Sequence, residues 1–170
     1  MLDYRKWLLL LAFIIGFSVG YGTKKYYYGS KFLVGKWEQD PIVVICPSSR
    51  VNVYRVIEAI DWWKDKGYNI NNYHYDIDNT VCSKGRFIEG VIFIRDKKEI
   101  GENILAETSR FMMVFEIVSA EVNFPDSNRY LPRLLEHELG HALGFGHVEE
   151  QGHIMHPILE MTGENFWIPE

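Results

Sequence analysis

The sequence predicts a mixed α/β fold built in layers, and two observations lead to that prediction. Continuous apolar, β-branched runs at residues 42–46 and 90–95 have the length and composition of buried strands. Apolar residues recur at helical spacing within residues 53–66, and a second helix is expected at residues 130–143. An order of strand, helix, several strands and helix favours a sheet covered by helices over a helical bundle.

Turn residues separate the expected elements. Pro47 ends the first strand, Ser48 or Ser49 can cap the helix that follows, and Gly67 can end that helix. Asn and Asp are frequent between residues 69 and 79, where turns are expected. In chain order the expected elements are a strand at 42–46, a helix at 53–66, a strand within 70–77, a strand at 90–95, a short edge strand at 104–108, a strand at 117–124 and a helix at 130–143.

An uncharged apolar run at residues 7–22 precedes this domain, with basic residues on both sides. It has the character of a signal-peptide core, with a small-x-small cleavage site at residues 18–20, or of an uncleaved membrane anchor. The run is short against the ~20 residues that span a bilayer. We favour the anchor, because Trp7 and the tyrosines at 26–28 suit a membrane interface. Either alternative places the folded domain outside the cytoplasm, anchored or secreted.

The expected organisation is an N-terminal hydrophobic helix or signal segment at residues 1–28, a linker at 29–40 and a folded domain at 41–170. The net charge of −5 gives no support to nucleic-acid binding. The two cysteines, Cys46 and Cys82, lack the close spacing of a zinc knuckle or a redox pair. An exported domain could join them in a disulfide, and the alternative is two buried thiols.

Residues 137–147 read HELGHALGFGH, which fills every fixed position of the pattern H-E-x-x-H-x-x-G-x-x-H. His137 and His141 lie four residues apart, so on a helix their imidazoles share one face and can reach one ion. Glu138 projects beside that face, where it can activate a metal-bound water without being a ligand.

The second half of the pattern supplies a third ligand. Gly144 can end the helix because glycine tolerates a positive φ, and His147 then arrives from a new direction. Three protein ligands and one open position are typical of a catalytic zinc, whereas a structural zinc is closed by four ligands.

Downstream of the motif stand Met155 and Pro157. With these residues the chain resembles the metzincin clan of zinc endopeptidases, and within it the matrixins (peptidase M10 type), very specifically over residues 134–157. The resemblance implies a metzincin-like α/β (α+β) catalytic domain with a mixed, mostly parallel twisted sheet, an active-site helix and a Met-turn at Met155.

By that resemblance the protein is a zinc metalloendopeptidase. One Zn²⁺ is held by His137, His141 and His147, and Glu138 activates the zinc-bound water. A protein or peptide substrate lies extended along an edge strand, for which residues 104–108 are the candidate. Met155 packs beneath the metal and is not a ligand.

The sequence also departs from the matrixin pattern. His156 stands where matrixins usually carry tyrosine, and it is either a donor to the oxyanion or a packing or surface histidine. His74, Asp76 and Asp78 are the only hint of the loop that binds a second zinc and calcium, so calcium stays open. The C-terminal helix is missing or reduced to residues 160–167.

Two other functions remain open. A metzincin-like domain without catalysis could bind a partner at the cell surface, although the intact Glu138 disfavours this. A zinc hydrolase of small peptides or cell-wall amides would need a cleft closed at one end, and cleft shape is not visible in a sequence.

Overall fold

A five-stranded sheet in the order β2-β1-β3-β5-β4 forms the centre of the protein, seen in a computed structural model that describes residues 32–98, 100–101, 104–125 and 131–169. All neighbouring strands are parallel except β4, which runs antiparallel to β5 at one edge. The strands are β1 (Ile42–Ile45), β2 (Tyr73–Tyr75), β3 (Val91–Asp96), β4 (Glu107–Met113) and β5 (Glu116–Phe124).

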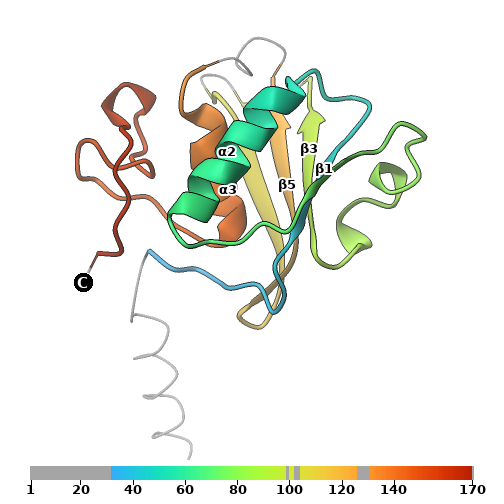
Figure 1. Ribbon diagram of the computed structural model, residues 1–170, viewed down its shortest axis with the longest axis horizontal. Coiled ribbons are helices and arrows are strands. Elements are labelled where there is room, and N and C mark those ends of the chain that lie inside the picture. The colour runs from blue at the N-terminus through green and yellow to red at the C-terminus, as the bar shows by residue number, and fades with distance from the viewer. Residues whose placement is uncertain (1–31, 99, 102–103, 126–130, 170) are drawn as a thin grey trace, which may run out of the picture. The chain divides into compact units, whose positions relative to one another are not determined.

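Helices α2 (Val53–Asp65) and α3 (Leu134–Leu143) pack on the same face of this sheet (Figure 1). Alternation along the strands supplies that core: Val43 and Ile45 of β1 face the helices together with Ile92 and Ile94 of β3. Val44 of β1 and Val91 and Phe93 of β3 lie on the opposite face. The predicted mixed α/β fold with a mostly parallel sheet is therefore confirmed.

The opposite face carries a smaller core closed by a disulfide between Cys46 and Cys82. Cys46 follows β1 directly, and Cys82 begins the 3₁₀ helix η1 (Cys82–Phe87). The structure thus forms the disulfide rather than two free thiols. A cross-link over 36 residues restricts the unfolded chain and stabilises the fold by about 3–4 kcal/mol in the loop-entropy account.

Several element boundaries differ from those expected. Asn52, not Ser48 or Ser49, caps α2, because its side-chain oxygen accepts the Tyr54 N–H at 2.8 Å. The edge strand expected at 104–108 is shifted: β4 begins at Glu107 and continues to Met113, where its ladder with β5 ends. After α3 the described chain holds one short 3₁₀ helix, η2 (Leu159–Met161), in agreement with a reduced C-terminal helix.

Residues 32–37, within the expected linker, pack on the domain. Phe32 is buried and stacks on Phe145 with ring centroids 5.1 Å apart. Trp37 Nε1 donates to the Ala142 carbonyl at 3.0 Å. The expected N-terminal hydrophobic helix at residues 7–22 lies outside the described residues. Within the described part of the chain, no helix is long and apolar enough to cross a membrane.

Asp76 organises the loop that leads to the disulfide. Its carboxylate accepts hydrogen bonds from the Thr80 N–H and hydroxyl and from the Val81 and Cys82 N–H groups, at 2.6–3.2 Å. Among the described residues, His74, Asp76 and Asp78 do not form a group able to hold a metal ion. Asp76 therefore has a structural role in this loop.

Replacing Asp76 by Asn should destabilise the protein in a pH-dependent way. Desolvation raises the pKa of Asp76, but the four hydrogen bonds outweigh it and hold the pKa below its ordinary value of 3.8. The stabilisation is therefore complete above that value and is lost as pH falls through the lower, folded-state pKa. Urea unfolding should show a deficit for Asp76→Asn at pH 7 that shrinks below about pH 4. Asp78→Asn, at an exposed position, is the matched control. If the loss of stability in Asp76→Asn were the same at acid pH as at pH 7, the ionised Asp76 carboxylate would not be the stabilising group.

Candidate metal centre

Helix α3 presents two histidines to one side and then stops abruptly. Gly144 adopts φ 109°, and a Cβ at this position would lie 2.1 Å from the Gly35 carbonyl oxygen. Both the backbone conformation and the space therefore require glycine, as predicted. Backbone hydrogen bonds hold the turn in place: Val34 N donates to Gly144 O at 2.8 Å, and Gly146 N donates to Phe32 O at 2.5 Å.

Beyond this turn His147 meets His137 and His141. One ring nitrogen from each lies within 4.8 Å of the others. The Nε2 atoms of His141 and His147 are 3.1 Å apart. No other group of three His, Cys, Asp or Glu side chains among the described residues is arranged to hold a metal ion.

Hydrogen bonds fix the orientation of two of the three rings. His137 Nδ1 donates to the Ile154 carbonyl and His141 Nδ1 donates to the Phe145 carbonyl, both at 2.8 Å. A carbonyl only accepts, so each Nδ1 carries the proton and each Nε2 lone pair is available for a metal. This donor set fits zinc.

Burial also keeps these imidazoles neutral. Desolvation lowers the pKa of His137 to about 4 and that of His141 to about 3. It also lowers the pKa of His147. A metal can therefore bind at neutral pH without displacing a proton from the two inner ligands.

Met155 follows Ile154, whose carbonyl accepts from His137, and is fully buried. A Cβ on Gly140 of α3 would come within 2.3 Å of its sulfur and 2.6 Å of the Trp63 ring. Gly140 is therefore the residue that lets the helix approach both side chains, a role that sequence reasoning missed. His153 is also fully buried, and its Nδ1 accepts the Met155 N–H at 3.0 Å.

Glu138 is buried beside the histidines and accepts a hydrogen bond from the edge strand β4. The Thr108 hydroxyl of β4 donates to Glu138 Oε2 at 2.5 Å. Burial raises the pKa of the Glu138 carboxyl to about 7. Sequence reasoning did not identify Thr108, because 30 positions separate it from Glu138 and no local pattern links them.

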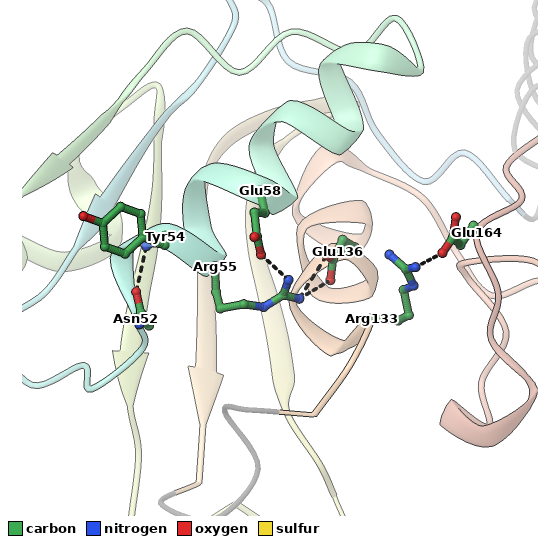
Figure 2. Close-up of polar contacts among 7 residues, drawn as sticks. All are labelled: Asn52, Tyr54, Arg55, Glu58, Arg133, Glu136 and Glu164. Carbon is green, nitrogen blue, oxygen red and sulfur yellow. Dashed lines mark hydrogen bonds and ion pairs between the residues drawn. The ribbon is translucent and has the colours of Figure 1, made fainter.

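Glu136 directly precedes His137 in α3. It is buried and pairs with Arg55 of α2, whose Nη2 lies 3.0 and 3.2 Å from the two carboxylate oxygens. Figure 2 shows Arg55 held between Glu136 and Glu58, and Arg133 paired with Glu164 of the C-terminal segment. The Arg55–Glu136 and Arg133–Glu164 pairs connect the start of α3 to α2 and to the C-terminal segment.

A cavity of about 630 Å³ opens over the histidines. One wall comes from the chain leading into β4, so residues 104–106 line the cleft even though β4 begins later. The other wall comes from the segment after Met155, including the buried His156, whose Nδ1 accepts the Ile158 N–H at 3.0 Å. The lining residues are Ile104, Leu105, Ala106, Thr108, Leu134, His137, Glu138, His141, His147, His156, Pro157, Ile158, Leu159 and Glu160.

The model of the matrixin family (peptidase M10) matches residues 57–170 of the chain. The match includes α3, the three histidines, Met155 and Pro157. No curated protein matches the chain.

The purified full chain should hold about one zinc, and His141→Ala should lose it, because two imidazoles alone do not complete a catalytic zinc site. Mass spectrometry of metals after dialysis measures the ratio. Zinc should also raise the unfolding temperature of the parent, since it binds only the folded state. His74→Ala, an exposed histidine on β2, is the control and should keep its zinc. Equal zinc content in His141→Ala and His74→Ala would show that His141 does not bind the metal.

Proposed function

The chain belongs to the matrixin family of metzincin-type zinc metallopeptidases, and from that premise we propose that it cleaves peptide bonds within protein substrates, with Glu138 as general base. One observation supports the assignment most directly. A buried carboxylate lies in the same cleft as three imidazoles whose free nitrogens converge. The intact Glu138 also favours an enzyme over a domain that only binds a partner.

His137, His141 and His147 would hold the metal. The zinc held there would supply Lewis-acid chemistry, which would lower the pKa of a bound water toward ~7 and polarise the substrate carbonyl. Glu138 accepts the proton of the attacking water and later gives it to the departing amine. Thr108 engages one oxygen of the Glu138 carboxylate, which leaves the other oxygen to receive that proton. Met155 supports the site by packing alone.

The substrate is expected to bind extended along β4. Within the described sheet, β4 pairs with β5 on one side and has no strand on the other, so its free backbone groups can pair with a peptide. The edge is seven residues long and continues past the cleft, which suits a polypeptide better than a small amide. Leu134, Ile158 and Leu159 give the cleft an apolar wall for a substrate side chain.

We also propose that the domain works outside the cytoplasm, held by residues 7–22 as a membrane anchor. The Cys46–Cys82 disulfide supports this location, because such bonds persist in oxidising compartments. Secretion after cleavage at residues 18–20 is the alternative.

Glu138→Gln should keep its zinc and lose about 100-fold or more of the cleavage rate on an unfolded protein, since the amide cannot accept the proton. Glu149→Gln, an exposed residue just outside the motif, is the control and should cleave normally. Full cleavage by Glu138→Gln would reject the mechanism. A zinc-loaded parent that cleaves no peptide of any length would indicate a binding domain, and one that cleaves only short peptides would indicate a small-substrate hydrolase.

Thr108→Val should lower kcat by about tenfold with little change in KM, because it removes one hydrogen bond to the carboxylate without changing the side-chain volume much. Thr108→Ser keeps the hydroxyl and should retain most of the rate. Steady-state kinetics on a fluorogenic peptide give both constants. Equal losses in the two variants would show that Thr108 acts through packing and not through its hydroxyl.

A further inference from the structure

The tip of the β4–β5 hairpin is apolar and exposed. Met113, Val114 and Phe115 follow one another there, and 59% of Met113 and 86% of Val114 are accessible to solvent. Tight hairpin turns ordinarily carry Gly, Asn or Asp. Consecutive exposed apolar residues are avoided in soluble proteins unless they meet a partner.

Val114 also has an unfavourable backbone conformation. Its φ is 60°, in the left-handed region that a β-branched residue rarely adopts. Asparagine or glycine would relieve the strain, and the exposed valine side chain gains little from packing inside the fold. Because packing within the fold does little to stabilise this strained residue, its conformation points to a contact outside the fold.

The surroundings of the tip indicate what kind of partner it fits. A hollow of about 470 Å³ beside Met113 is lined by Trp37 and by three carboxylates, Glu38, Glu89 and Glu116. An acidic rim disfavours a negatively charged surface. The partner that fits best therefore takes up the apolar tip and presents a neutral or zwitterionic surface around it.

Lys36, four residues after the start of the described chain, lies next to this hairpin. Lys36 N donates to the Phe115 carbonyl at 3.2 Å, and Ile117 N donates to the Lys36 carbonyl at 2.8 Å. Nine residues, 23–31, separate the apolar run at 7–22 from Phe32. Fully extended, they span at most about 30 Å. A bilayer that held the run would therefore lie within reach of the hairpin.

We propose that residues 113–115 dock into the interface of a zwitterionic phospholipid bilayer, the bilayer that holds residues 7–22. The proposal rests on the membrane anchoring put forward above and goes beyond it, because it assigns a lipid-contacting surface to the folded domain. Apolar side chains at the tip enter the headgroup region, and the carboxylate rim stays in water.

Docking would set the height of the active site. β4 runs from the tip to Thr108 beside Glu138, and six residues of strand cover roughly 20 Å. The cleft would thus lie at most about 20 Å above the membrane. Its substrates would be extended protein segments close to the membrane surface.

Site-specific fluorescence on the full chain tests the docking. The two native cysteines are disulfide-bonded, so a single introduced cysteine can be labelled with the polarity-sensitive dye NBD. Val114→Cys reports on the tip. Ile77→Cys is the matched control, because Ile77 is 76% exposed and follows β2 at the opposite end of the parallel strands. Both proteins are reconstituted into phosphatidylcholine liposomes, and flotation measures anchoring separately.

The expected result is flotation of both proteins, with blue-shifted emission and quenching by doxyl-labelled lipid only at position 114. Flotation with both probes equally exposed to water would overturn the docking and leave the anchor standing. Loss of flotation would overturn the anchor and the docking together. A blue shift without lipid quenching would mean that protein covers the tip, which also rejects the proposal.

A second pair of proteins tests the role of Val114 itself. The probe is placed at Met113→Cys, with Val114 retained or replaced by Asn, which tolerates a positive φ. The Val114→Asn protein should be at least as stable to heat and should lose the lipid quenching. Retained quenching would overturn the role of the apolar tip. Addition of phosphatidylserine should not strengthen quenching in the parent, and a requirement for it would contradict docking by apolar contact.

Discussion

The site depends on how helix α3 ends. The last turn exposes carbonyl groups that need donors, and distant parts of the chain supply them. Arg110 of β4 donates to His141 O at 2.7 Å, and Trp37 donates to Ala142 O at 3.0 Å. Gly144 then turns the chain in a conformation that brings His147 back over the helix. A helix that continued for another turn would carry the third imidazole away from the other two.

The same helix packs against α2, the edge strand β4, β5 and Met155. Gly140 allows α3 to approach both Met155 and Trp63 of α2 closely. Glu136 binds Arg55 on the far side from the cleft. Glu138 faces the cleft and meets Thr108. Two acidic residues on either side of His137 thus have different environments, because the helix directs one toward α2 and the other toward the edge of the sheet.

Prediction from the sequence succeeded where structure is local. The grouping of His137, His141 and His147 follows from helical spacing and from a glycine at the turn, both of which are visible over residues 137–147. Strands β1 and β3 are covered on both faces, so they read as continuous apolar runs. Edge strand β4 alternates between exposed and half-buried residues, and its limits became clear only from its pairing with β5.

By itself the sequence determined the grouping of His137, His141 and His147 and the turn at Gly144, because these depend on spacing within one short segment. It also gave the order of the main elements, and the role of Glu138 as general base stays a prediction. The tertiary structure decided the Cys46–Cys82 bond, the Thr108–Glu138 contact and the Arg55–Glu136 pair. It also placed the apolar hairpin tip beside the start of the domain. These contacts join residues far apart in the chain, and only the packing of the sheet against its helices brings such residues together.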